Sequence, residues 1–168
     1  MRRTVAALAP ALLSLGLLSC GVPAQPAARK EAPSVAKAGE KIDWLTAPEG
    51  PVAPLVAKER AAAAQRGHQV LVYIGATWCE PCRRFHEAVR SGALDQRFGG
   101  LRLVEFDLDR DGLHLREAGY APKMIPMLAL PAKDGFATGK QVEGSVKGDG
   151  AVASLSARLD SLLQQDAL

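Results

Sequence analysis

Cysteine and aromatic residues are scarce in this chain of 168 residues. Three cysteines are too few for a small scaffold that depends on many disulfides. Aromatic residues make up only 5% of the sequence, which argues against a surface that stacks nucleic-acid bases. The formal net charge of +3 is also too small to indicate a nucleic-acid-binding surface, so we expect no nucleic-acid partner.

The chain also lacks a hydrophobic run long enough for a transmembrane helix. The run over 5–18 has 14 residues, whereas a membrane-spanning helix needs about 20. A basic start, Met1-Arg2-Arg3, precedes this run, which is typical of a signal peptide over 1–19. The sequence Leu17-Leu18-Ser19-Cys20 then resembles the bacterial lipobox, which implies cleavage before Cys20 and lipid on that cysteine. A plain secretory signal with an incidental cysteine is the alternative.

The next segment, 20–40, is rich in alanine, proline, lysine and glutamate and has no aromatic residue. Such a segment cannot bury enough apolar surface to offset its ordering entropy. We therefore predict a flexible tether between a lipid anchor and a domain over 41–168. The protein would then be held at the membrane of a bacterial cell envelope, facing the periplasm or the cell exterior.

Helical and strand patterns alternate through 41–168, which predicts an α/β fold. The strand at 69–74 is an unbroken apolar run, as expected of a strand buried on both faces. A turn at Lys133-Asp134-Gly135 predicts a hairpin in the second half. The predicted helices are 51–66, 81–90, 113–118 and 151–163, and the predicted strands are 69–74, 101–107, 127–130 and 140–143.

Two cysteines follow the first predicted strand and open the next helix, in the sequence Trp78-Cys79-Glu80-Pro81-Cys82. Unpaired N–H groups and the positive end of the dipole at a helix N-terminus favour thiolate, so the cysteine pKa is expected below its free value of about 8.5. The spacing lets Cys82 reach back to Cys79 within one turn, so a disulfide can form and break. Pro81 suits the first turn because its missing N–H would be unpaired there.

Four segments together resemble the thioredoxin family over about residues 42–165: 70–82, Met124-Ile125-Pro126-Met127, the turn at 133–135 and Gly144. The resemblance implies a thioredoxin fold, a central mixed sheet with helices on both faces. The Cys-Glu-Pro-Cys motif is similar to that of membrane-tethered thioredoxins of cytochrome c maturation. Trp44 and the helix that starts at Cys82 are more similar to the C-terminal thioredoxin domain of the periplasmic electron carrier DsbD, which is the better comparison over the whole length.

The same resemblance implies a thiol–disulfide oxidoreductase that reduces protein disulfides outside the cytoplasm. Cys79 would be the exposed nucleophile, and the more buried Cys82 would resolve the mixed disulfide. Pro126 would be cis and would present the backbone of Ile125 to the substrate, while Trp78 would shield one side. No cofactor is expected besides the Cys79–Cys82 couple; the expected partners are disulfide-bearing proteins and a membrane electron donor.

Three positions depart from the family pattern. Tyr73 stands where many members bury an aspartate that carries the proton of the resolving thiol, Met127 replaces a threonine, and His86 replaces an acid. Our hypothesis is that Glu80 or His86 moves protons to and from Cys82, since Cys82 and His86 share one helical face at i,i+4 spacing. The alternative is that His86 is solvated and water serves.

Two other function classes stay open. The same cysteines could deliver copper(I), with Met124 and Met127 beside them, because thiolates and thioethers suit that soft ion. The second class is a non-redox binding protein with the thioredoxin fold. Such domains have often lost one of the two cysteines, and both are present here, which argues against this class. A zinc site is disfavoured because no second cysteine or histidine pair exists.

The sequence Asp107-Leu108-Asp109-Arg110-Asp111-Gly112 resembles the start of a calcium-binding loop. Its twelfth position is Ala118 rather than glutamate, and the segment leaves a strand rather than a helix. We therefore predict a turn of solvated carboxylates.

Overall fold

The structure is a computed structural model, and it describes residues 39–166. The predicted signal peptide, Cys20 and nearly all of the predicted tether lie outside this range, so those expectations stay predictions. Within the described residues, no helix combines the length and the apolar character needed to cross a membrane.

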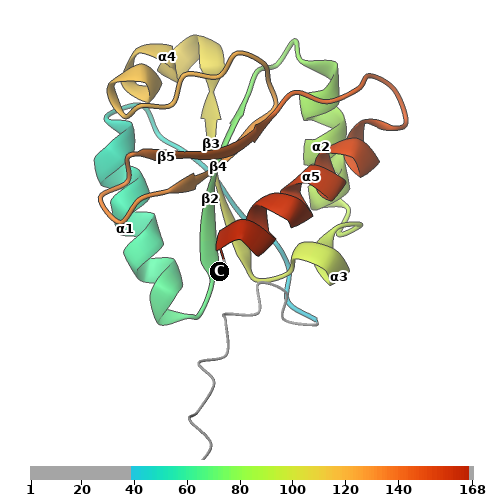
Figure 1. Ribbon diagram of the computed structural model, residues 1–168, viewed down its shortest axis with the longest axis horizontal. Helices are drawn as coiled ribbons and strands as arrows, with labels where there is room; N and C mark the ends of the chain where they lie inside the picture. The colour runs from blue at the N-terminus through green and yellow to red at the C-terminus, as the bar shows by residue number, and fades with distance from the viewer. Residues whose placement is uncertain (1–38, 167–168) are drawn as a thin grey trace, which may run out of the picture. The chain divides into compact units, whose positions relative to one another are not determined.

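A five-stranded mixed sheet forms the centre of the described part (Figure 1), in the order β1-β3-β2-β4-β5. Strands β1, β3 and β2 run parallel, while β4 is antiparallel to both β2 and β5. This arrangement confirms the predicted α/β class, the parallel pair and the hairpin. The strands are β1 (Asp43–Thr46), β2 (Gln69–Gly75), β3 (Leu101–Asp107), β4 (Met127–Pro131) and β5 (Ala137–Glu143).

Helices cover both faces of this sheet. In Figure 1, α1 and α4 lie on one side, and α2, α3 and α5 lie on the other. Each side has its own apolar core, because successive side chains of a strand point to opposite faces. Leu71 and Tyr73 of β2 enter one core, and Val70, Val72 and Ile74 enter the other. The helices are α1 (Val52–Gln65), α2 (Glu80–Arg90), α3 (Asp95–Phe98), α4 (Leu108–Glu117) and α5 (Ala151–Asp166).

Two short elements, β1 and α3, were not predicted. Strand β1 has only four residues and no apolar alternation, so its pattern alone carries no strand signal. Tertiary contacts hold it instead. Arg102 of β3 forms ion pairs with Asp43 of β1 at 2.6 Å and with Glu59 of α1 at 2.7 Å.

The predicted turn of solvated carboxylates is wrong, because α4 begins at Leu108 rather than at 113. Asp107 is its N-cap, and one carboxylate oxygen accepts the backbone N–H groups of Asp109 and Arg110 at 2.9 and 3.1 Å. Asp111 is only 2% exposed and pairs with Arg110 at 2.8 Å. These carboxylates start a helix and bind its first turn, which is a local role that needs no calcium ion.

Candidate active site

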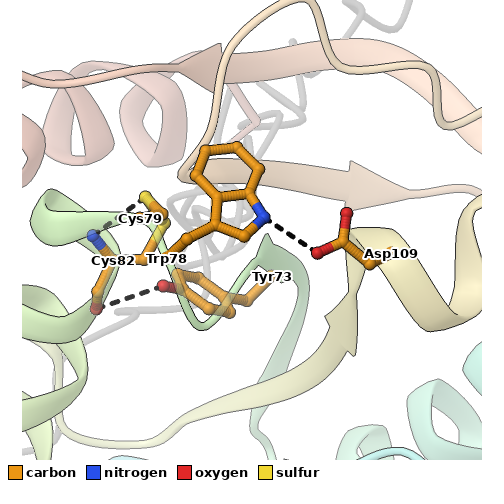
Figure 2. Close-up of a disulfide and its surroundings, with 5 residues drawn as sticks. All are labelled: Tyr73, Trp78, Cys79, Cys82 and Asp109. Atoms are coloured by element: carbon orange, nitrogen blue, oxygen red, sulfur yellow. Dashed lines mark hydrogen bonds between the residues drawn. A yellow bond between two sulfur atoms is a disulfide. The ribbon is translucent and has the colours of Figure 1, made fainter.

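The two cysteines lie at the turn that connects β2 to α2 and in the first turn of that helix. Strand β2 ends at Gly75, and Cys79 is the N-cap of α2. Cys79 and Cys82 form a disulfide with Cα atoms 5.2 Å apart. The backbone N–H of Cys82 also donates to Cys79 Sγ at 3.2 Å (Figure 2). Pro81 is buried in the first turn, as predicted. The Sγ of Cys79 therefore already occupies the place where a helix N-terminus offers an N–H to a thiolate.

Exposure does not distinguish the two cysteines in this disulfide form. The resemblance implied an exposed Cys79 and a more buried Cys82, yet each residue is 4% exposed. Both belong to the core that α2 makes with the sheet, together with Phe85. This packing of the helix N-terminus against the core buries the pair equally, so position in the helix, and not exposure, distinguishes the two cysteines.

Trp78 is the most exposed large apolar residue next to the disulfide, at 63%. Its indole N–H donates to a carboxylate oxygen of Asp109 in the first turn of α4 at 2.8 Å. Figure 2 shows the indole extending from the cysteine loop toward Asp109. This bond fixes the ring of Trp78 although solvent surrounds it.

The loop before β4 forms the other wall beside Trp78. The Ile125–Pro126 peptide bond is cis, and Pro126 is buried. A pocket of about 290 Å³ is bounded by Trp78 on one side and by Met124 and Ile125 on the other. Met124 is 62% exposed. The structure thus places Trp78 and Ile125 around one largely apolar hollow. The cis bond before Pro126 agrees with the resemblance, while the roles of Trp78 and Ile125 toward a substrate stay predictions.

Glu143 of β5 binds the backbone of this loop. Its carboxylate accepts the backbone N–H groups of Lys123 and Met124 at 2.9 and 3.1 Å. The neighbouring Gly144 donates its N–H to the Pro126 carbonyl at 2.8 Å. Arg158 of α5 donates in turn to the carbonyl of Glu143 at 2.6 Å. Sequence reasoning missed Glu143 and Arg158, because nothing in their local pattern marks them.

Comparison with known proteins agrees with this arrangement. Residues 54–129 match the sequence profile of a family described as thioredoxin-like. The described residues therefore have an α/β fold of the thioredoxin type. No curated protein matches the chain significantly.

Solved thioredoxin structures are similar to this thioredoxin-like domain at low identity. A Trichomonas vaginalis thioredoxin is 20% identical, covers 74% of this chain and 96% of its own, and has a TM-score of 0.48. Thioredoxin NaTrxh from Nicotiana alata is 17% identical, covers 77% and 97%, and has a TM-score of 0.49. Oxidised thioredoxin O1 from Arabidopsis thaliana is 18% identical, covers 73% and 96%, and has a TM-score of 0.44.

Tyr73 fills the interior of this thioredoxin-like domain behind Cys82. It is 1% exposed, and its hydroxyl donates to the Cys82 carbonyl at 3.4 Å. Its ring stacks on Phe85 with centroids 5.7 Å apart. Burial, together with the negative charge of Glu105, raises the pKa of Tyr73 well above its usual value. The phenol therefore stays neutral and is a structural donor to the backbone.

Glu80 contacts other groups than Cys82. Its carboxylate accepts from Arg84 one turn later and from the backbone N–H of Gly148 at 3.3 Å. The hydrogen bond from Arg84 lowers the pKa of Glu80. A carboxylate that is held ionised in this way is poorly suited to carry a proton near neutral pH, so the geometry disfavours Glu80 in our proton hypothesis.

His86 is half-buried and packs against another ring. Its ring stacks on Trp44 with centroids 4.5 Å apart and planes 21° apart. It also lines a pocket beside Cys82. His86 therefore stays a candidate for proton transfer to Cys82.

The described residues offer little for a metal ion. Among them, no group of three or more histidine, cysteine, aspartate or glutamate side chains could hold one. Met127 is fully buried, so Met124 alone of the two methionines faces solvent. The two cysteines would thus have to supply most of any copper(I) site after reduction of their disulfide.

Proposed function

We propose that the protein is a thiol–disulfide oxidoreductase that reduces protein disulfides outside the cytoplasm through the Cys79–Cys82 couple. The observation that carries this proposal is the cysteine pair at the N-terminus of α2, closed as a disulfide beside an apolar hollow. Helix position favours Cys79 as the attacking thiolate, since its Sγ accepts an N–H that would stabilise negative charge. Cys82 would then attack Cys79 Sγ and release the reduced substrate.

The reducing direction rests on analogy. A proline between the cysteines is shared with reducing thioredoxins, and the motifs around it resemble those of DsbD and of the cytochrome-maturation branch. Compartments outside the cytoplasm are oxidising, so a reductase there needs a membrane electron donor. We propose such a donor as the second partner of the protein, and lipid on Cys20 as the link that keeps the domain near it.

Trapping tests the roles of the two cysteines. In a Cys82→Ser variant the mixed disulfide cannot be resolved, so a model substrate with one disulfide should remain bound to Cys79. The Cys79→Ser variant should trap much less. Non-reducing gels with mass spectrometry of the bound peptide read out both. Equal trapping through either cysteine would contradict the assignment.

The reduction potential tests the direction. The chain is equilibrated in redox buffers and its free thiols are alkylated. A value near that of thioredoxin, about −270 mV, supports a reductase, whereas about −120 mV, as in a strong oxidant, would make it a disulfide donor. If no reversible disulfide formed, the oxidoreductase proposal would fail, and copper(I) binding that Cys79→Ala abolishes would be measured next.

Lipidation has its own test. Bacteria that express the full chain are fed an alkyne-tagged fatty acid, and the protein is examined for the tag. Tagging of the wild type, lost in a Cys20→Ala variant, is expected. An untagged wild-type chain that is cleaved and released would favour a plain secretory signal.

A further inference from the structure

A pocket of about 310 Å³ lies beside Cys82 and shares no residue with the hollow at Trp78. Its walls come from the end of β2, the first turns of α2 and the end of β3. Exposed residues, Thr77 and Arg83, form part of its rim, so water can enter. Six of the lining residues have side chains that can ionise: Tyr73, Cys82, Arg83, His86, Glu105 and Asp107.

Glu105 is the unexplained member of this set. It lies on β3 directly opposite Tyr73 of β2. Its Oε2 accepts two hydrogen bonds, from the indole N–H of Trp44 at 2.9 Å and from the hydroxyl of Thr46 at 2.8 Å. Its Oε1 has no hydrogen-bond donor among the described residues. One oxygen is therefore anchored, and the other is available to water.

The other ionisable groups in the pocket are less suited to accept a proton from Cys82. Tyr73 stays a neutral phenol. Asp107 is the N-cap of α4, and its charge interacts with the guanidinium of Arg110 on that helix, so it is committed to the start of α4. Arg83 is a cation without an acceptor. Only Glu105 and His86 remain, and His86 is stacked flat on Trp44, the same indole that donates to Glu105.

We propose that Glu105 is the carboxylate that exchanges the proton of the Cys82 thiol, through water held in this pocket. The proposal rests on the proposed function, because the proton must move only if Cys82 resolves a mixed disulfide. Glu105 would then replace, from the neighbouring strand, the aspartate whose position Tyr73 occupies. Because Glu105 would act on the Cys82 thiol through water, it is a positioning residue rather than a catalytic residue.

Cys79 is first joined to a substrate sulfur in a mixed disulfide. The Cys82 thiol gives its proton to pocket water and so to Glu105, and the Cys82 thiolate attacks Cys79 Sγ. A bond forms between Cys79 and Cys82, and the bond from Cys79 to the substrate breaks. The substrate sulfur leaves as a thiolate with the electron pair, and the proton passes from Glu105 to solvent.

Two-phase kinetics test the proposal. The reduced full chain is mixed with dithiobis(nitrobenzoate), an aromatic disulfide that releases one coloured thiolate on attack by Cys79 and a second when Cys82 resolves the mixed disulfide. In Glu105→Gln, which keeps an oxygen acceptor for Trp44, the first phase should match that of the wild type. The second should be slower by about tenfold or more near neutral pH, within the usual range for lost proton transfer. At alkaline pH, where the thiol ionises unaided, the two proteins should converge.

Four further variants distinguish proton exchange by Glu105 from a purely structural role of that residue. Thr46→Val removes one partner of Glu105 without removing its carboxylate, and Glu87→Gln removes the same charge from the exposed side of α2. Both should keep the second phase within about twofold of wild type, a change too small for lost general-base catalysis. Glu105→Asp should recover part of the rate. His86→Gln should have a smaller effect than Glu105→Gln.

The outcomes are distinguishable. A wild-type second phase in Glu105→Gln, or a loss of rate that persists equally at alkaline pH, overturns the role of Glu105 and leaves the proposed function intact. A larger loss in His86→Gln assigns the proton to His86 instead. If the wild type itself shows no first phase, the proposed function fails. If thermal melting shows that Glu105→Gln does not fold, the pH profile of the second phase in Glu105→Asp tests the role of Glu105 instead.

Discussion

The hydroxyl of Tyr73 donates to the backbone carbonyl of Cys82, 3.4 Å away. Tyr73 stands where many thioredoxins are expected to bury an aspartate. A phenol whose pKa is raised by burial cannot exchange protons as a carboxylate does. If Cys82 resolves a mixed disulfide as we propose, its proton therefore has to leave by a route other than Tyr73.

Removal of that hydroxyl should have a small effect. In Tyr73→Phe we expect a loss of at most about 1 kcal/mol in the free energy of unfolding, because the bond is long and the ring keeps its stack on Phe85. Urea denaturation of the oxidised protein measures it. The resolving rate should stay within about twofold, too little for lost proton transfer. A tenfold slower resolution would instead make Tyr73 part of the proton route.

Asp109 should matter for substrate binding more than for stability. Asp109→Ala frees the exposed indole of Trp78, so we expect a higher KM for a protein disulfide with kcat nearly unchanged. Stability should fall by less than about 1 kcal/mol, from one lost acidic residue in a first helical turn. Glu117→Ala, at the other end of α4, is the matched control and should leave KM unchanged. Equal KM values in both variants would contradict a positioning role.

Glu143 should position the loop that carries the cis proline. In Glu143→Ala the N–H groups of Lys123 and Met124 lose their acceptor, and about 1 kcal/mol of stability should be lost. The KM for a protein disulfide should rise more than kcat falls. Glu143→Gln keeps an acceptor oxygen and should restore most of the KM. If Gln and Ala behave alike, the hydrogen bonds to the loop are not what matters.

Glu80 should give a pH-dependent contribution to stability. Its hydrogen bond from Arg84 depresses its folded pKa below the ordinary value of 4.5. The stabilisation is therefore present above pH 4.5 and is lost as pH falls through the folded pKa. The melting temperature of the wild type should exceed that of Glu80→Gln at neutral pH, and the gap should close in acid. A gap between wild type and Glu80→Gln that stays the same in acid would contradict this assignment.

Local signals predicted the elements that build the cysteine site. The apolar run of β2, the cysteine spacing and Pro81 together indicated a strand, a turn and a helix, and the structure has all three. The same reasoning failed where local pattern is weak. It missed β1, whose four residues depend on Arg102 and on pairing with β3, and it took the helix cap at Asp107 for a solvated turn.

Local sequence was enough to specify the chemistry available at this site: two thiols with two residues between them, where a strand is followed by a helix. Which polar groups surround those thiols depends on the fold. Glu105 and Asp109 lie more than twenty positions from Cys82 along the chain, and they approach the cysteine turn because parallel β2 and β3 end at the same edge of the sheet. A carboxylate in a strand or at a helix start carries no local mark of its partner, since that partner is set by strand order and register.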